Sequence, residues 1–259
     1  GLPSLRAYFE ELERVGGGLS RKCKLVVLGD GEAGKTSLVR GLRKCIPNPA
    51  QSDERTIQLE LGELRLKDGE QEVALSVWDL GGQPRYASVQ QAFLVKGALY
   101  LAVVPAHRVE SSFEDVLGRW LDYLAARAPG AVVQVVLAHV DQLDPPPKTL
   151  EPDELARAAE RQLAFVRGKL DEHAKQQYLA KEAHSRLEKL EVQEAIPCVY
   201  SLAGGDASLR AVRNRLECIV FSRPMLLPSV GVTVPRSWLT AMALVRALRF
   251  GLDTLAEAR

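Results

Sequence analysis

The chain has 259 residues, enough for one large domain or two small ones with a full hydrophobic core. Lys and Arg number 34 against 33 Asp and Glu, so the net charge of +1 gives no electrostatic argument for nucleic acid or an anionic membrane as partner. We therefore expect one α/β domain with appendages and no nucleic-acid partner.

The cysteines and the hydropathy pattern indicate a reducing compartment. Cys23, Cys45, Cys198 and Cys218 lack the paired spacing of a metal site, so we expect buried free thiols. The longest apolar run, residues 97–106, is too short to span a bilayer, and no N-terminal signal pattern is visible. These features predict a cytoplasmic protein without a transmembrane segment.

The N-terminal residues 2–15 predict a short amphipathic helix. Their apolar side chains recur at helical spacing, as Leu5, Tyr8, Phe9 and Leu12. The glycines at 16–18 should end this helix and act as a joint. The helix could be the tail of a preceding domain.

A phosphate-binding loop organises the chain. Residues 29–36 read G-x-x-x-x-G-K-T between an apolar strand, residues 23–28, and the start of a helix. The glycines let successive backbone N–H groups surround a polyphosphate, and the helix N-terminus adds a partial positive charge. Lys35 would reach the outer phosphates, and the Thr36 hydroxyl would bind Mg2+.

Two strands and an acidic turn follow this helix. Residues 57–66 alternate apolar and polar, and residues 73–78 form a more buried strand after the hairpin signal Asp68-Gly69. The motif Asp-Leu-Gly-Gly-Gln begins at Asp79, where the second strand ends. Because ligands lie at the carboxyl ends of strands in open α/β sheets, we expect Asp79 near the phosphate loop. A simple turn is the alternative for this motif taken alone.

Strands and helices continue to alternate beyond this motif. Residues 99–104 and 132–138 are apolar runs typical of buried strands, and a capping-box pattern at residues 111–114 opens a helix between them. The alternation predicts an α/β fold with a mostly parallel six-stranded sheet covered by helices on both faces.

A helical insertion is expected at about residues 151–195. Apolar residues there recur at three- and four-residue steps, which predicts a long helix or a helical hairpin. Its dense charges favour a solvated face over a dedicated docking surface. His173 and His184 are interpreted as surface residues rather than metal ligands.

The last part of the chain returns to the sheet and then leaves it. Residues 196–200 predict a final strand, residues 209–219 a closing helix and residues 221–235 a proline-punctuated connector. Another amphipathic helix begins at Pro235-Arg236-Ser237-Trp238 and runs almost to Arg259, as if it opened a further domain.

The motifs, in this order, resemble those of the Ras-like small GTPases over residues 22–221. The matching elements are the phosphate loop at 29–36, the switch I threonine Thr56, the switch II motif at 79–83, the base-recognition motif at 138–141 and, at Ser201-Leu202-Ala203, the final motif. The resemblance implies a Ras-like P-loop GTPase fold that binds GTP or GDP with Mg2+.

Within that superfamily the chain most resembles the Roc domain of the Roco proteins. Those proteins carry T-H-x-D in the base motif and switch II sequences similar to W-D-x-x-G-Q. The Pro-x-x-Trp helix after the connector resembles the entry to a COR domain. The resemblance implies a helical linker at 1–20 that could follow leucine-rich repeats, a Roc domain at 21–221 and the start of a COR-like region at 222–259.

The resemblance also assigns roles to single residues. Thr36, Thr56 and, through water, Asp79 would hold Mg2+. Catalysis would depend on Gln83, which orients the attacking water, together with Lys35 and Thr56. The nucleotide would contact Gly29, Gly31, Glu32, Ala33, Gly34, Lys35, Thr36, Ser37, Gly82, His139, Asp141, Ser201 and Leu202.

Two departures from the family pattern concern the nucleotide base. Ala138 replaces the Asn or Thr of the base motif, and residues 201–203 match S-A-K only in part. Guanine specificity therefore depends chiefly on Asp141, whose carboxylate would accept two N–H bonds from guanine and repel the acceptor edge of adenine. His139 would stack on the base.

These expectations describe a slow GTPase switch within a larger signalling protein. Without an arginine finger, Ras-type sites turn over at only about 10^-4 per second. A nucleotide-stabilised scaffold with negligible GTPase activity is one alternative, and an ATPase is another. Expected partners are guanine nucleotide, COR and leucine-rich-repeat domains of a parent chain, an unidentified signalling protein and a second copy in a parent dimer.

Overall fold

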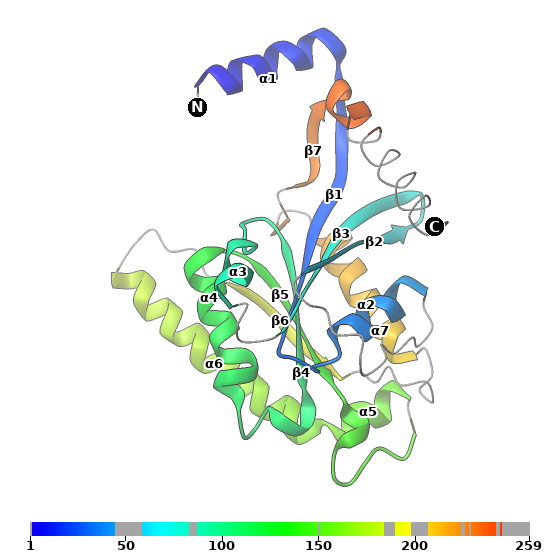
Figure 1. Ribbon diagram of the computed structural model, residues 1–259, viewed down its shortest axis with the longest axis vertical. Coiled ribbons are helices and arrows are strands. Elements are labelled where there is room, and N and C mark those ends of the chain that lie inside the picture. Colours follow the sequence, from blue (N-terminus) through cyan, green and yellow to red (C-terminus); the bar gives the residue numbers. More distant parts are fainter. Residues whose placement is uncertain are drawn as a thin grey trace. The chain divides into compact units, whose positions relative to one another are not determined.

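The chain divides into two compact units (Figure 1). Unit 1 comprises residues 1–21 and 228–259, and unit 2 comprises residues 22–227. The computed structural model describes residues 2–44, 59–82, 87–149, 151–183, 190–197, 207–223, 226–227, 229–241 and 244.

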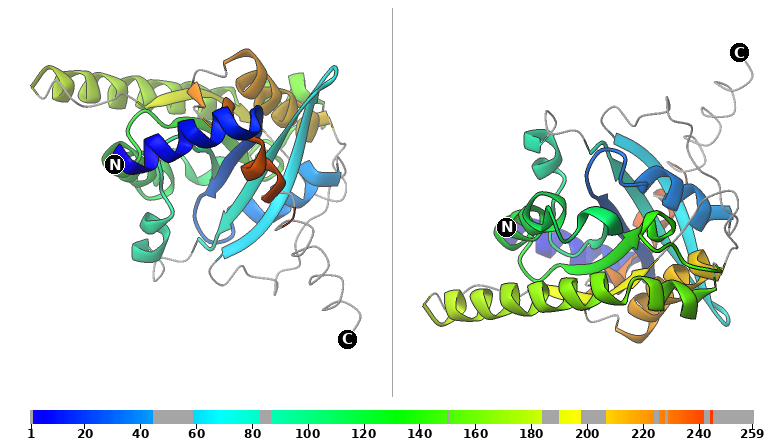
Figure 2. Two further views of the ribbon diagram at one scale, coloured as in Figure 1. Left: turned by 90° about the horizontal axis from the view of Figure 1, so that it is seen from above. Right: turned by 90° about the horizontal axis from the view of Figure 1, so that it is seen from below.

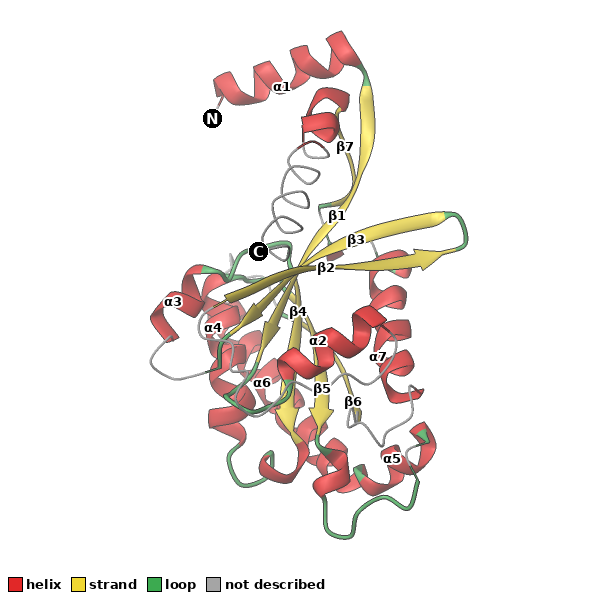
Figure 3. Ribbon diagram, turned by 45° about the vertical axis from the view of Figure 1, so that its right-hand side comes forward, coloured by secondary structure: helices red, strands yellow, loops and turns green. Residues whose placement is uncertain are grey.

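Unit 2 is built on a mostly parallel sheet (Figure 3). The strands lie in the order β2-β3-β1-β4-β5-β6, and only β2 runs antiparallel to its neighbour, β3. This order confirms the predicted α/β sheet. The strands are β1 (Gly17–Leu28), β2 (Leu59–Asp68), β3 (Gln71–Leu80), β4 (Leu99–Pro105), β5 (Val132–Ala138) and β6 (Glu191–Pro197).

Helices cover both faces of this sheet, as predicted (Figure 1). One face carries α2 (Lys35–Lys44) and α7 (Ala207–Glu217), which continues into η5 (Cys218–Ser222). The other carries α3 (Ala87–Ala92), α4 (Arg119–Arg127) and α6 (Glu160–Ala183). Every residue of β4 and β5 is buried, because covered parallel strands have no wet face. The main core lies on the α4 and α6 side.

The β2-β3 hairpin follows the expected turn. Asp68 pairs with Gln71 around a two-residue loop, and Gly69 has a positive φ of 55° that glycine adopts readily. The strand predicted to end at residue 66 continues to Asp68, because the pairing extends to the turn. Residues 57 and 58 lie outside the described part of the chain.

The helical insertion ends earlier than predicted. It contains α5 (Pro152–Ala158) and α6, which is long and extends along one side of unit 2 (Figure 2). Strand β6 then begins at Glu191, so the helix predicted to reach residue 195 and the strand predicted for 196–200 were both placed too late. Leu190 and Val192 alternate with polar residues and join the core, a strand pattern hidden among charges. Residues 184–189 and 198–200 lie outside the described residues.

The capping-box prediction at residues 111–114 was wrong in detail. The Ser111 hydroxyl donates to the carbonyl of Arg108 at 3.2 Å, instead of capping a helix. The helix begins with a wide turn, η3 (Glu114–Gly118), which leads directly into α4. Packing of buried Val116 and Leu117 against the sheet therefore determines this start more than a cap does.

Two side chains of unit 2 differ from their predicted surroundings. The His173 side chain is only 15% exposed, and its Nε2 lies 3.3 Å from Asp122 Oδ1, so it joins α6 to α4 instead of facing solvent. Cys23 is buried as expected, whereas Cys218 is exposed. Cys45, Cys198 and His184 lie outside the residues that the structure describes.

Unit 1 contains a second pairing of β1. The unit begins with α1 (Leu2–Val15), and residues 17–21 of β1 then pair antiparallel with β7 (Val230–Pro235). The glycines predicted as a joint therefore lie partly in a strand, and the predicted connector contains β7. Gly17 lies so close to Thr233 that a Cβ would overlap with that side chain, which explains the glycine by packing rather than by flexibility.

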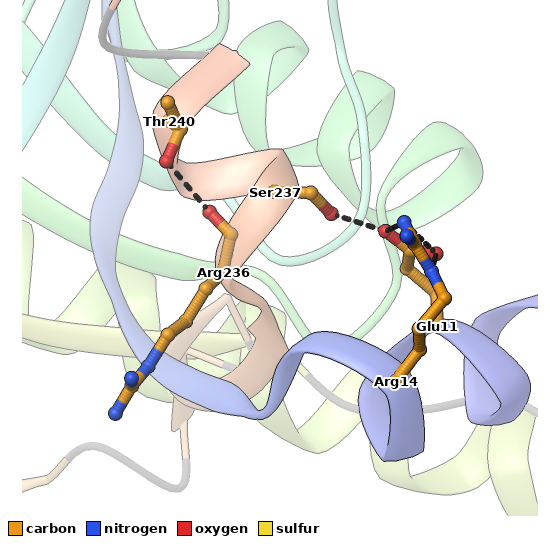
Figure 4. Close-up of polar contacts among 5 residues, drawn as sticks. All are labelled: Glu11, Arg14, Arg236, Ser237 and Thr240. Carbon is orange, nitrogen blue, oxygen red and sulfur yellow. Dashed lines mark hydrogen bonds and ion pairs between the residues drawn. The ribbon is translucent and has the colours of Figure 1, made fainter.

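Polar contacts join α1 to the helical residues that follow β7 (Figure 4). The Ser237 hydroxyl donates to Glu11 at 2.7 Å, and Arg14 donates to the same carboxylate at 2.8 Å. The Thr240 hydroxyl donates to the carbonyl of Arg236 at 3.0 Å. Residues 236–241 are helical, where the sequence predicts a helix from Pro235.

Of the helices described in either unit, none has the length and apolar character needed to cross a membrane.

Candidate functional site

The carboxyl ends of four parallel strands place the predicted motifs along one edge of the sheet. The phosphate loop follows β1, the Asp79 motif closes β3, η2 (Ala106–Arg108) follows β4, and His139 with η4 (Val140–Gln142) follows β5. Parallel neighbours present these ends on the same side, so the loops form one surface. Four predicted site residues lie outside the described part: Thr56, Gln83, Ser201 and Leu202.

The phosphate loop has a backbone that its glycines make possible. Gly29 has φ 141°, and a Cβ there would overlap with the carbonyl of Val103 in β4. Gly34 has φ 88°, and Glu32 adopts a left-handed φ of 64°, which is uncommon for a residue with a side chain. At Gly31 an added Cβ would meet no described atom within 4 Å. The loop is thus tightly packed at its base and open at Gly31.

Lys35 lies beneath this loop. Its side chain is 6% exposed, and its Nζ donates to the backbone carbonyl of Asp30 at 2.7 Å. Burial lowers the pKa of Lys35, while the nearby carboxylates of Asp79 and Asp30 act in the opposite direction. An ammonium group buried in a region of low dielectric constant interacts strongly with an anion that reaches it.

Thr36 and Asp79 form the second polar contact of the site. The Thr36 hydroxyl donates to Asp79 Oδ2 at 2.6 Å, and Asp79 is 1% exposed. Its other oxygen, Oδ1, is buried and has no hydrogen-bond partner among the described residues. Burial raises the pKa of Asp79, against the effects of the Thr36 bond and of Lys35. A buried carboxylate with an uncommitted oxygen beside a hydroxyl fits a hydrated Mg2+ ion.

The acidic residue inside the loop has partners that sequence reasoning missed. The Asp30 carboxylate forms an ion pair with Arg119 at the start of α4, and its Oδ2 lies 4.0 Å from Arg108. Burial raises the pKa of Asp30, and the two arginines lower it. The ion pair ties the loop to α4. No sequence pattern connects these residues, because they lie far apart in the chain.

A second missed contact lies at the glycine pair after Asp79. Gly82 packs against the backbone of Asp30 and Gly31 so closely that a Cβ would overlap with it. The buried side chain of Gln90, in α3, donates a hydrogen bond to the carbonyl of Gly81. The predicted switch II motif therefore contacts the predicted phosphate loop through Gly82 and is hydrogen-bonded by Gln90 at Gly81.

The base-recognition motif adopts a special backbone conformation. His139 has a left-handed φ of 57°, and its Nδ1 lies 3.3 Å from Gln142 Nε2. The imidazole of His107 lies edge-on to His139, with ring centroids 6.2 Å apart. Burial lowers the pKa of His107, as do His139 and Arg108, while Asp141 raises it. Asp141 and two histidines therefore share this end of the site, and His107 is a neighbour that sequence reasoning missed.

Comparison with known families identifies this region. Residues 24–141, from the core of β1 to the base motif, match the family model described as "Ras of Complex, Roc, domain of DAPkinase". Over these residues the chain is therefore similar to Roc domains. The family predicted from the residues of the motifs is thereby confirmed.

Individual relatives agree with this assignment. The chain is 31% identical over 156 residues to human malignant fibrous histiocytoma-amplified sequence 1, covering 54% of this chain and 14% of that protein. It is 28% identical over 198 residues to human Ras-related protein Rab-4B, covering 74% of this chain and 89% of that protein. The chain spans 6% to 15% of the length of the leucine-rich-repeat and histiocytoma-amplified relatives that it matches.

A solved structure supports the fold. The structure of Methanosarcina barkeri Roco2 RocCORdC bound to GDP superposes with a TM-score of 0.57 and 19% identity, over 87% of this chain and 56% of that chain. At this level of identity the similarity shows a shared fold. It confirms the predicted Ras-like α/β architecture.

Proposed function

We propose that the Roc domain binds GTP and GDP with Mg2+ and acts as a switch that hydrolyses GTP slowly. The observation that carries this proposal is the pairing of buried Lys35 with the Thr36–Asp79 contact directly behind a glycine-rich loop. Lys35 provides a cation for the phosphates, and Thr36 and Asp79 provide oxygen ligands for a metal. All three lie in one buried part of the site.

The phosphates would lie in the loop after β1. Backbone N–H groups of the loop would surround them, and Lys35 would exchange its contact with the Asp30 carbonyl for a phosphate oxygen. The hydroxyl of Ser37 would donate to the α-phosphate. The loop residues assigned to this task are Gly29, Gly31, Glu32, Ala33, Gly34, Lys35 and Ser37.

The metal would be held by Thr36 directly and by Asp79 through water. When bound, Mg2+ would neutralise charge that develops on the β- and γ-phosphates. Asp79 would keep its carboxylate ionised beside the cation, which offsets the cost of burying that charge. The Thr36 hydroxyl oxygen would ligate the ion through a lone pair, while its O–H group would go on donating to Asp79.

Three residues would contact the γ-phosphate or orient the water that attacks it. Thr56 would close over the metal and the γ-phosphate, the Gly82 N–H would bond the γ-phosphate, and Gln83 would orient the attacking water. Loss of the γ-phosphate would release both switch segments. Without an arginine finger, hydrolysis at such a site proceeds at about 10^-4 per second.

The base would lie at the end of β5. Asp141 would accept two N–H bonds from guanine, and His139 would stack on the ring with Ser201 and Leu202 nearby. Asp141 is partly exposed next to His107 and His139, where a base could reach it. This placement supports a guanine nucleotide over an adenine nucleotide, because adenine offers acceptors where Asp141 needs donors.

The flanking regions support a place in a longer chain. The match to the RocCORdC structure extends beyond residues 24–141 to 87% of the chain. We propose that residues 222–259 begin a COR-like region and that residues 1–20 link the Roc domain to a repeat domain. A parent chain with these domains would be a cytoplasmic signalling protein with an unidentified partner, and could dimerise through COR.

A hydrolysis assay with a matched variant tests the switch. Phosphate release from GTP is followed under single-turnover conditions for the wild type and for Gln83→Leu, while GDP affinity is measured in parallel. A switch GTPase shows slow release that falls in the variant at unchanged GDP affinity. A nucleotide-stabilised scaffold shows no release to lose, and displacement of GDP by ADP instead would indicate an ATPase.

A further inference from the structure

The α-carbon of Gly82 lies against the phosphate loop. Gly82 packs on the backbone of Asp30 and Gly31 with no space for a side chain. The carbonyl of the peptide between Gly81 and Gly82 belongs to Gly81, and its N–H belongs to Gly82. In a trans peptide these two groups point in opposite directions, so a bond that fixes one also fixes the other.

The carbonyl of this peptide is held by Gln90. The Gln90 side-chain amide donates to Gly81 O, and Gln90 is only 4% exposed. A buried amide without a hydrogen bond costs free energy, so this contact is expected to persist. The Gly82 N–H is therefore turned away from α3.

The helix that carries Gln90 is itself anchored to the sheet. Lys24 of β1 donates through Nζ to the carbonyl of Phe93, directly after α3, at 3.0 Å. The same Nζ lies 3.7 Å from the ring centroid of Trp78 in β3, and the Trp78 and Phe93 rings are 5.4 Å apart. Gln90 therefore reaches Gly81 from a fixed base.

We propose that Gln90 is a positioning residue that holds the Gly82 N–H toward the phosphate loop and thereby sets the preference for a nucleoside triphosphate over a diphosphate. The inference deepens the proposed function and rests on it. Gln90 itself does not touch the nucleotide. It acts through the peptide between Gly81 and Gly82.

The physical basis is preorganisation of a single donor. With the Gln90 bond in place, the orientation of the Gly82 N–H is fixed before the nucleotide binds, so a γ-phosphate oxygen would meet this donor without a turn of the peptide. Without the bond, the peptide samples other orientations, and a triphosphate has to select one of them. A diphosphate lacks the γ-phosphate, so its affinity does not depend on this peptide.

Equilibrium affinities for GDP and for GTPγS, measured with Mg2+, test the proposal. Gln90→Met removes the donor at similar volume, and Gln91→Met makes the same change on the next residue of α3. We expect Gln90→Met to lower GTPγS affinity about tenfold, the worth of one hydrogen bond to a charged group, at unchanged GDP affinity. Gln91→Met should leave both affinities at the wild-type values. Gln90→Leu, which also lacks a donor, serves if Gln90→Met does not fold.

The results separate this inference from the proposed function. An unchanged ratio of the two affinities in a folded Gln90 variant would overturn the inference alone. An equal loss of both affinities would also overturn it, because Gln90 would then support the loop as a whole. A wild type that binds neither nucleotide would overturn the proposed function and the inference together.

Discussion

The proposed phosphate end and the proposed base end of the site are built differently. At the phosphate end, Lys35 and Asp79 are buried with their polar atoms directed at the loop. At the base end, His139 and Asp141 are only partly buried and follow the last residue of β5. The first end therefore contains buried charged groups that are shielded from water, whereas the second depends on partly exposed side chains.

This difference indicates which function each end controls. Buried charges without full pairing are costly to the fold, so they are expected where they bind something that offsets the cost. Partly exposed side chains cost the fold little free energy, and they contribute selectivity through hydrogen bonds to one base. Nucleotide affinity should therefore depend mainly on the phosphate end and nucleotide identity on the base end.

Lys35→Met should have the largest effect of any single change. It removes the buried cation, and the loss of a buried charged partner predicts a fall in GDP affinity of about 100-fold or more. Burial lowers the pKa of Lys35, which means that the folded state disfavours its charged form. The unfolding temperature measured without nucleotide should therefore be unchanged or higher in the variant. Lys67→Met, at an exposed lysine of the β2-β3 hairpin, is the control. Equal GDP affinity of both variants would contradict the phosphate assignment.

Asp141→Ala should reduce the selectivity for guanine over adenine nucleotides. It removes the acceptor of two guanine N–H bonds, which predicts a loss of GDP affinity of about 100-fold with little change for ADP. Inosine diphosphate, which lacks the 2-amino group, should bind the wild type about tenfold more weakly than GDP. In Asp141→Ala this difference should vanish. A difference that persists would place the guanine contact on another residue.

Asp79→Asn should weaken the metal and spare the fold. Loss of a group that acts on the metal through water lowers metal affinity by about tenfold. Burial raises the pKa of Asp79, so the folded state disfavours the ionised form, and the neutral amide should keep or raise the unfolding temperature without Mg2+. The measurement is GDP affinity titrated with Mg2+, next to thermal unfolding with a chelator. Lower stability with wild-type Mg2+ dependence would mean that Asp79 is structural.

His107→Gln should show the smallest effect. The folded pKa of His107 lies below its ordinary value of 6.5, so the unfolded chain takes up the proton first as pH falls, and stability is lost below about that pH. The side chain is exposed to solvent, so screening keeps this loss below about 1 kcal/mol. Urea unfolding at about pH 7 and pH 5.5 should show a slightly smaller drop for the variant. An identical drop in both proteins would remove His107 from this pH dependence.

Local patterns carried most of the fold prediction. The apolar runs of β4 and β5, the Asp68-Gly69 turn and the phosphate loop each specify their structure over a few residues. The errors came where a long-range partner decides. Strand β7 is defined by its pairing with residues 17–21, and β6 by its pairing with β5. Short strands among charges or prolines give little signal of their own.

The site divides in the same way. Lys35, Thr36 and Asp79 were predicted to lie together because their motifs fix their spacing and chemistry, and the structure places them side by side. The partners Arg119, for Asp30, and Gln90, for Gly81, were missed because each arrives from a distant element and belongs to no motif. Sequence motifs specify the groups proposed to bind a ligand, while the supporting contacts depend on the packed fold.

Extraction of nucleotide from the purified protein in Mg2+ tests the central claim most directly. The protein is denatured, and the released nucleotide is identified and quantified by chromatography. The account predicts guanine nucleotide, mainly GDP, at close to one molecule per chain, and its absence from Lys35→Met. Adenine nucleotide in the extract would contradict the role of Asp141. No retained nucleotide, with no uptake of added GDP, would contradict the assignment of the loop itself.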